Sequence, residues 1–382
     1  MQGCFLIGIG MGMAKQDMRM IGVVAMVVVL WCWSVGVTSQ STSSRPVFIF
    51  GDSLVDSGNN NYLVTIARAD YSPYGIDAPN RRATGRFSNA MNIADLICEM
   101  LGTEPVLPYL NPSIGTPSNL LRGANFASAG VGILNDTGIQ FGPVLRMFVQ
   151  LEFFREYQNR VAAIIGRSAA DQMVANGLIS ITLGGNDYVN NYYLVPVSVR
   201  SVEYPNVADY NNFIVREYKK ILARLYELGG RRIMVTATGP LGCVPSQRAL
   251  RTLDGGCDPT LQRVAGLFNA GLRNIINELN SQYGGTVYTF ANSFDMNMDF
   301  VNNPQAFGFQ TAQYACCGQG RFNGIGTCSP ISAVCPNRNV YVWWDDYHPT
   351  ERVNRIVVNR LFNGGSSDMY PVNLRTMLNM DD

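Results

Sequence analysis

The chain has 382 residues, of which 47% are hydrophobic and 15% are charged, and its formal net charge at pH 7 is +1. This composition, without a low-complexity tract, is typical of a globular protein, and the length allows one large or two ordinary domains. The near balance of charge excludes the strongly basic class that binds nucleic acid or anionic membrane surfaces, so we expect neither as a partner.

The N-terminus has the three-part layout of a secretory signal peptide. Two basic residues precede a thirteen-residue apolar run, Ile21–Trp33, and a stretch of small and polar residues follows it. A membrane-spanning helix needs about 20 apolar residues, so the run favours a cleaved signal over an anchor. We predict a signal peptide over 1–39, with the starting methionine left open, and one secreted domain over 40–382 without stable membrane insertion.

Short apolar or β-branched runs alternate with longer segments of helical period along the rest of the chain. A strand–helix order repeated five times predicts one doubly wound parallel sheet covered by helices. A proline at 349 suits the first position of the last helix. The predicted strands are 47–50, 123–128, 178–183, 232–237 and 286–290, and the predicted helices are 89–101, 144–165, 169–176, 210–228, 261–283 and 349–362.

Nine cysteines indicate an oxidising destination. Two of them leave with the signal peptide, and Cys98 lies in an apolar helical stretch, where we expect a buried free thiol. Six remain, enough for three bridges among fifteen possible connectivities, and Cys243 with Cys257 closes a short loop and is the preferred pair. Zinc is disfavoured because there is no C-x-x-C pair and the one histidine serves elsewhere, so we expect no metal.

The only histidine, His348, stands three residues after Asp345. Near the other end, Ser53 follows directly after the first predicted strand. A serine hydroxyl becomes a good nucleophile when an imidazole accepts its proton and a carboxylate orients that imidazole. The three residues therefore predict a catalytic triad of nucleophile, base and acid. The alternative interpretation is that a lone histidine is an ordinary surface or core residue. The position of Asp345 three residues before His348 and the turn that carries Ser53 both argue against it.

Hydrolysis of an ester also requires donors aimed at the carbonyl oxygen where negative charge develops. The Asn186 side chain and the backbone N–H groups of Gly130 and Ser53 are the candidates for this oxyanion hole. Each follows a predicted strand, and in a doubly wound sheet the carboxyl ends of the strands share one rim. The run 184–187, Gly-Gly-Asn-Asp, also has the composition of an ordinary turn and is weak evidence by itself. The prediction of an oxyanion hole therefore depends on all three candidates following predicted strands.

Taken together, these features resemble the plant-type GDSL esterase/lipase family of the SGNH hydrolase superfamily. The resemblance implies a three-layer α/β/α fold with a mostly parallel five-stranded sheet, Ser53, Asp345 and His348 as the triad, and Ser53, Gly130 and Asn186 as the oxyanion hole. It also implies secretion, to the apoplast or cell wall, and no cofactor. The matching stretches are Phe50–Asn60, Ala124–Gly132, Thr182–Asn191 and Trp344–Glu351.

Several neighbouring residues carry secondary expectations. Asp52 could orient the nucleophile loop or serve as a helix-start acid, and Asp346 should point to solvent. Asn135 begins an N-glycosylation sequon. Six aromatic side chains could shape an acyl pocket, although packing in the core is the favoured interpretation: Tyr188, Tyr192, Tyr193, Phe307, Phe309 and Tyr314.

The favoured function is a secreted serine esterase or lipase that acts on small-molecule or lipid esters through an acyl-enzyme on Ser53. An acyltransferase that remodels polyesters would use the same acyl-enzyme. An inactive module that binds cell wall or lipid is disfavoured because no triad member is missing. A purely structural cysteine-linked protein leaves the histidine unexplained, and the oligomeric state stays open.

If His348 is the base, esterase activity should rise with pH between about 5 and 8, because only the neutral imidazole can take the Ser53 proton. A pH profile of kcat/KM on a soluble ester checks this. A rate that stays level across that range would argue against the assignment.

Overall fold

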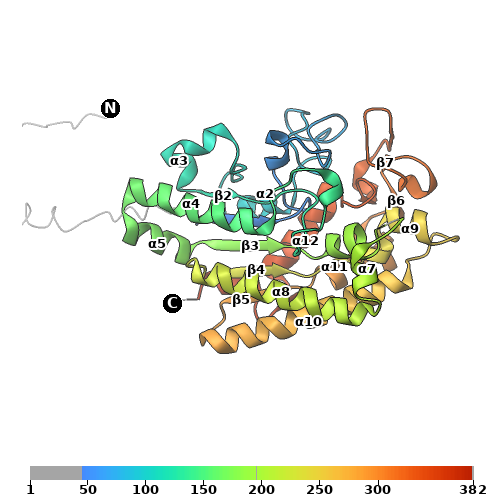
Figure 1. The fold of residues 1–382 in the computed structure, drawn as a ribbon. Helices are drawn as coiled ribbons and strands as arrows, with labels where there is room; N and C mark the ends of the chain where they lie inside the picture. The colour runs from blue at the N-terminus through green and yellow to red at the C-terminus, as the bar shows by residue number, and fades with distance from the viewer. Residues whose placement is uncertain (1–44, 195, 381–382) are drawn as a thin grey trace, which may run out of the picture. The chain divides into compact units, whose positions relative to one another are not determined.

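A sheet of five parallel strands with a sixth, antiparallel strand at one edge forms the centre of the molecule (Figure 1). The computed structural model describes residues 45–194 and 196–380, so the predicted signal peptide lies outside the described residues. The strand order is β10-β5-β4-β3-β1-β2. The strands are β1 (Val47–Gly51), β2 (Gly123–Asn125), β3 (Leu178–Thr182), β4 (Ile233–Thr236), β5 (Tyr288–Ala291) and β10 (Met369–Tyr370).

Side chains on the central strands alternate between two separate cores. Phe48 and Phe50 of β1 enter one apolar cluster, whereas Val47 and Ile49 enter the other. Every residue of β1 is buried, which is the pattern of a parallel sheet that is covered on both faces. The predicted α/β/α fold is therefore confirmed.

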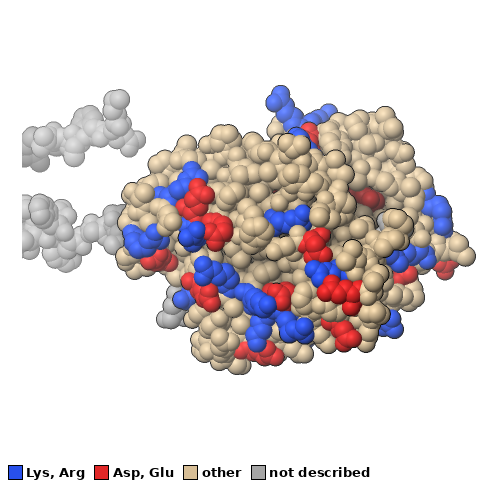
Figure 2. Space-filling view, in the orientation of Figure 1, with Lys and Arg blue, Asp and Glu red and all other residues tan. Residues whose placement is uncertain are grey.

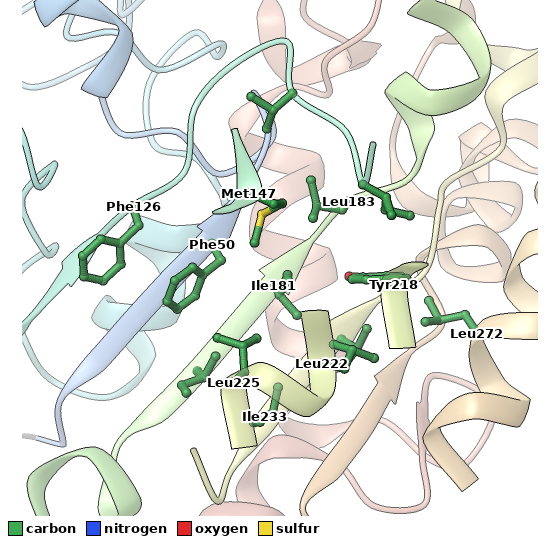
Figure 3. Close-up of a cluster of buried hydrophobic side chains, with 14 of the residues drawn as sticks. Phe50, Phe126, Met147, Ile181, Leu183, Tyr218, Leu222, Leu225, Ile233 and Leu272 are labelled. Atoms are coloured by element: carbon green, nitrogen blue, oxygen red, sulfur yellow. The ribbon is translucent and has the colours of Figure 1, made fainter. Parts of the chain in front are cut away.

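The larger core lies between the sheet and the helices α4 (Met147–Ile165), α5 (Arg167–Asn176), α8 (Val207–Glu227) and α10 (Pro259–Tyr283), which face the viewer in Figure 1. Figure 3 shows Phe50, Ile181 and Ile233 of the strands meeting Tyr218, Leu222 and Leu225 of α8. In α10 the apolar residues recur at three-and-four spacing, as predicted, and the Asp258 side chain caps the helix by accepting from Leu261 N.

The second core lies on the opposite face, where α12 (Glu351–Asn363) packs against α2 (Ile93–Met100) and α13 (Leu374–Leu378), with α11 (Ser293–Asn302) nearby in the cluster. The remaining short helices are α3 (Pro117–Leu120), α6 (Gly185–Asp187), α7 (Val199–Glu203) and α9 (Pro245–Arg251). None of the helices within the described ranges has the length and apolar character needed to cross a bilayer.

Most element bounds differ from the predicted ones by one to four residues, and the structure adds elements that were not predicted, among them a sixth strand in the main sheet. The helix predicted over 349–362 is α12, which begins at Glu351 after the N-cap Thr350, so placing Pro349 at its first position was wrong; Pro349 instead bridges to Trp343. β2 ends at Asn125, although the next residues still follow β1, with Ser128 N donating to Gly51 O at 2.9 Å. β10 is two residues long, too short for any alternation in the sequence to reveal it.

Three disulfides cross-link segments near the turn that carries His348. They are Cys243–Cys257, Cys316–Cys335 and Cys317–Cys328, and the first is the pair preferred from the sequence. The last two follow β6 (Thr311–Ala315), which pairs in parallel with β9 (Tyr341–Trp343), and they flank the β7 (Cys317–Gly318) and β8 (Ala333–Val334) pair. Cys316 N donates to Trp343 O at 3.0 Å, and Cys317 N donates to Trp344 O at 2.7 Å. The bridges therefore brace the segment that leads directly to Asp345.

Charged side chains of both signs occur on the face shown in Figure 2, where acidic side chains border a run of basic ones across the lower half. Many form pairs across short distances, such as Lys219 with Glu278 at 2.7 Å. Exposed pairs of this kind contribute little stability. The fold therefore depends on the two apolar cores rather than on surface charge.

Replacing Cys316 and Cys335 together with alanine should lower the free energy of unfolding by about 2–4 kcal/mol, because the unfolded chain loses a cross-link. Urea unfolding under non-reducing conditions measures this. Cys98 is the matched control, since it is buried and free, as predicted. The bracing role fails if the double variant loses no more stability than Cys98→Ala.

Candidate active site

The turn after β1 projects Ser53 toward the rim of the sheet. Gly51 has a φ of +138°, and a Cβ there would lie 2.3 Å from Thr182 O, so only glycine fits where β1 and β3 run closest together. Asp52 N then donates to Thr182 O at 3.2 Å, and the Asp52 carboxylate accepts from Leu54 N at 3.1 Å. This contact holds the turn that carries Ser53 and is compatible with both roles predicted for Asp52.

The fold brings Ser53, His348 and Asp345 into one hydrogen-bonded chain. Ser53 Oγ lies 2.7 Å from His348 Nε2. His348 Nδ1 lies 2.8 Å from Asp345 Oδ1 and 2.9 Å from Oδ2. The imidazole packs against Phe87, with ring centroids 4.8 Å apart. Serine and imidazole are therefore within hydrogen-bonding reach, and a carboxylate fixes the far side of the ring.

Asp345 is fully buried, yet its carboxylate is surrounded by donors. Oδ1 accepts from the backbone N–H groups of Tyr347 at 2.9 Å and His348 at 2.8 Å. Oδ2 accepts from the Tyr74 hydroxyl at 2.8 Å. Burial by itself raises the pKa of Asp345, but the charge and hydrogen bond of His348 and the two backbone donors bring that pKa below its usual value. Asp345 therefore stays ionised beside the imidazole.

Asp346 does not point to solvent, so that prediction was wrong. Asp346 is only 5% exposed. Burial, together with the charge of Asp345, raises the pKa of Asp346 well above its usual value. The reason is that Ser246 N donates to Asp346 O at 3.0 Å and Gln247 donates to the Tyr347 hydroxyl at 2.9 Å, so α9 covers the turn. Only the small part of Asp346 that lines the cavity beside Ser53 stays accessible.

The three predicted oxyanion donors line the same cavity as Ser53 and His348. Asn186 Nδ2 donates to Val131 O at 2.9 Å, and Asn186 Oδ1 accepts from Asn190 at 2.7 Å, which leaves the second amide N–H of Asn186 for a ligand. Within the described ranges, the N–H groups of Ser53 and Gly130 donate to no protein acceptor. Gly130 has a φ of +86°, and a Cβ there would lie 2.5 Å from the Phe141 ring. The arrangement can receive a developing oxyanion.

Two buried carboxyls that the sequence analysis did not single out hold the oxyanion loops. Asp187 accepts from Ile133 N at 2.8 Å, Leu134 N at 3.0 Å and the Thr137 hydroxyl at 2.7 Å. Burial raises its pKa to about 6, against the lowering effect of these bonds. The only trace of this role in the sequence is that the aspartate belongs to the Gly-Gly-Asn-Asp run. That run has the composition of an ordinary turn, in which an aspartate needs no such hydrogen-bond donors, so the sequence did not reveal the role.

Asp56 plays the corresponding part beside the serine loop. Its carboxylate accepts from Gly58 N at 2.7 Å, Asn59 N at 2.8 Å and Ala129 N at 3.1 Å. Asn60 Nδ2 donates to Ala129 O at 3.1 Å. Burial raises the pKa of Asp56 to about 6. The polar end of the stretch Phe50–Asn60 therefore ties the nucleophile loop to the loop that carries Gly130.

The cavity around Ser53 has a volume of about 440 Å³. None of the six aromatic side chains considered from the sequence lines it, and Tyr188 and Tyr192 pack in the core, which is the interpretation that the sequence favoured. The aromatic residues that line it are Tyr71, Tyr74, Phe87, Phe141, Trp343 and Tyr347. They come from three separate parts of the sequence, 71–87, 141 and 343–347, so no single stretch of it marks the pocket.

Other predicted site features stand as follows. Asn135 is exposed, and the hydroxyl of Thr137 in the same sequon is occupied by Asp187. No group of three or more metal-ligating side chains occurs in the part of the chain that the structure describes. The six bridged cysteines form disulfides rather than a cluster of thiolates.

Comparisons with known proteins match the sequence of this chain to one family. A model of GDSL-like lipase/acylhydrolases matches residues 47–361, a range that contains the predicted triad residues and the predicted oxyanion donors. GDSL esterase/lipase LTL1 of Arabidopsis thaliana is 55% identical over 343 residues, covering 90% of this chain and 93% of the relative. GDSL esterase/lipase 7 of the same plant is 39% identical over 344 residues, covering 88% and 93%.

Asp345→Asn and Asp346→Asn form a matched pair of adjacent, isosteric changes. The first should lower kcat by about 10³–10⁴-fold, because an amide favours the wrong imidazole tautomer and cannot stabilise the imidazolium. The second should leave kcat within about threefold, because His348 Nδ1 bonds the carboxylate of Asp345 and not that of Asp346. Steady-state kinetics on one ester measures both, and the reverse pattern would assign the acid role to Asp346.

Proposed function

This chain belongs to the GDSL-like lipase/acylhydrolase family of carboxylic ester hydrolases, and we propose that it cleaves its ester through an acyl-enzyme on Ser53 Oγ. The observation that carries the proposal is the unbroken chain Ser53–His348–Asp345, with contacts of 2.7 and 2.8 Å, in a cavity lined by Gly130 and Asn186. Nucleophile, base, acid and oxyanion donors are then all present within one site.

In the first half of the reaction, Ser53 Oγ attacks the ester carbonyl carbon while its proton passes to His348 Nε2. The carbonyl π electrons move to oxygen, where the N–H groups of Ser53 and Gly130 and the Asn186 amide stabilise the negative charge. When the tetrahedral species collapses, the carbon–oxygen bond to the alcohol breaks, and the imidazolium gives its proton to the departing alkoxide. Asp345 keeps the ring oriented throughout.

In the second half, water takes the place of the alcohol. His348 accepts a proton from the water as it attacks the acyl carbonyl, and the same three donors stabilise the second oxyanion. Collapse breaks the bond to Ser53 Oγ, which recovers the proton from the imidazolium, and the carboxylic acid leaves. Transfer to a second alcohol would follow the same steps with the acceptor replacing water, so the two activities differ only in what enters the open site.

We also propose that the protein is secreted as one domain after removal of 1–39 and that Asn135 carries a glycan. Three disulfides support an oxidising compartment, since such bridges persist in secreted proteins. The exposure of the Asn135 residue supports the glycan, because a bulky substituent requires a free surface.

A fluorophosphonate probe tests the function, because it reacts only with a serine that a neighbouring base activates. The mature protein should be labelled on Ser53, as located by peptide mapping. Ser53→Ala should remove the label, and His348→Ala should reduce it at least tenfold although the serine remains.

Equal labelling of the wild type and His348→Ala, or labelling of a different serine, would contradict the proposed mechanism. Folded wild-type protein that takes no label would instead point to a binding role. After labelling, products formed with and without a hydroxylated acceptor distinguish hydrolysis from acyl transfer.

A further inference from the structure

Asp346 and the adjacent Asp345 differ in the hydrogen bonds of their carboxyl groups. Both residues are buried, and both line the cavity around Ser53. The oxygens of Asp345 accept hydrogen bonds from two backbone N–H groups, from the Tyr74 hydroxyl and from the His348 imidazole. Among the described residues, by contrast, the carboxyl of Asp346 has neither a hydrogen-bond partner nor an ion-pair partner.

The carboxyl of Asp346 faces the cavity rather than the packed interior. Some polar atoms in the described part of the chain, such as Tyr218 Oη and Asn354 Oδ1, have no partner and are also sealed from solvent. The carboxyl oxygens of Asp346 lack a protein partner too, but they are not sealed in this way. Because Asp346 is 5% exposed and lines the cavity, its accessible part lies there. A buried polar group without a partner is costly, and a ligand in the cavity can supply the partner.

Two more polar side chains, Tyr71 and Thr327, line the cavity near Asp346. Burial raises the pKa of Tyr71, and the charges of Asp345 and Asp346 raise it further, so the phenol lies within electrostatic reach of both carboxyls. Tyr71 donates to Cys328 O at 3.3 Å, and its oxygen can still accept. Thr327 is exposed, so the cavity reaches solvent here. We call Asp346, Tyr71 and Thr327 the Asp346 subsite.

The Asp346 subsite lies on the side of the cavity that receives the alcohol part of the ester. In the proposed mechanism His348 gives its proton to the departing alkoxide, so the alcohol oxygen lies beside the imidazole. Asp346 stands two residues before His348, and their Cα atoms are at most about 7.6 Å apart, the length of two trans peptide units. Gly130 and Asn186 follow β2 and β3 on other loops and serve the carbonyl oxygen.

We propose that Asp346 binds a free hydroxyl in the alcohol part of the substrate, and that the protein therefore prefers esters of polyhydric alcohols with a hydroxyl next to the ester oxygen. This inference rests on the proposed acyl-enzyme at Ser53. It applies equally to an entering alcohol, because an acceptor that replaces water takes the position that the first alcohol has left.

A hydroxyl fits this carboxyl better than a cation or an alkyl group does. Burial and the charge of Asp345 raise the pKa of Asp346 well above its usual value, which favours the protonated carboxyl. A protonated carboxyl and a hydroxyl each donate and accept, so the two groups can satisfy each other. A cation pairs best with an ionised carboxylate, and an alkyl group would leave the carboxyl without a partner.

The test compares 2-hydroxyethyl butyrate with propyl butyrate, two esters in which a hydroxyl replaces a methyl group. Titration of the butyric acid that the mature protein releases gives kcat/KM. We expect the value for the hydroxyethyl ester to be about tenfold higher, after correction for the rates of alkaline hydrolysis. Asp346→Leu should bring the ratio to within about twofold of one, through a loss on the hydroxyethyl ester alone.

Two further variants separate hydrogen bonding from structural effects. Asp346→Asn should keep at least about half of the preference, because an amide also donates and accepts. Tyr347→Phe is the matched control at the next position, since Gln247 already donates to the Tyr347 hydroxyl at 2.9 Å. Its ratio should stay within about twofold of that of the wild type.

If Asp346→Leu does not fold, Asp346→Ala replaces it and should show the same loss of preference. Asp346→Ala should also unfold at a urea concentration no lower than that of the wild type, because the carboxyl has no protein partner to lose. A clearly lower midpoint would assign Asp346 a structural role instead. Fluorophosphonate labelling verifies that each variant has an assembled site.

Equal kcat/KM for the two esters in active, labelled wild type would overturn the inference and leave the serine mechanism intact. The same holds if Tyr347→Phe changes the ratio as much as Asp346→Leu does. Absence of both turnover and label in the wild type would instead remove the proposed function itself.

Two more substrates test the other ligands of the Asp346 subsite. If butyrylcholine is preferred to the hydroxyethyl ester and Asp346→Leu removes that preference, the subsite binds a cation and the inference is wrong. Propyl 3-hydroxybutyrate, compared with propyl butyrate, places the hydroxyl in the acyl part. If Asp346→Leu alters that pair and not the alcohol pair, the subsite binds the acyl part and the inference is likewise wrong.

Discussion

The site depends on one buried carboxylate that joins distant parts of the chain. Asp345 accepts from Tyr74, 271 residues earlier, and holds His348, which reaches Ser53 across 295 residues. A fully buried charge without partners would be very costly, so its position is defined by the donors around it. The turn that bears Asp345 is held by β9, the disulfides and α9. These elements therefore support the position of one side chain.

Buried carboxyls that accept several hydrogen bonds also occur on the other side of Ser53. Asp56 and Asp187 are buried carboxyls whose acceptor oxygens are filled by backbone N–H groups and a hydroxyl. Each spans two loops that follow different strands, and together they place Gly130 and Asn186 beside Ser53. Rigid loops matter here because oxyanion donors stabilise charge best when they need not reorganise during the reaction.

The doubly wound sheet explains why these loops meet. The strand order reverses beside β1, because β2 lies on one side of it and β3 on the other. The crevice at such a point opens at the carboxyl ends of the strands. α12 then runs back from His348 along the opposite face of the sheet.

The sequence by itself determined the alternating strands and helices, the preferred Cys243–Cys257 pair and the residues that would gather around Ser53. These follow from periodicity, from spacing and from chemistry that few residue types can perform. Tertiary structure alone decided the short edge strand β10, the burial of Asp346 and the partners of Tyr74, Asp56 and Asp187. It also decided which aromatic and aliphatic side chains line the cavity. Burial and long-range hydrogen bonds depend on which distant segments pack together, and no local pattern of residues encodes that.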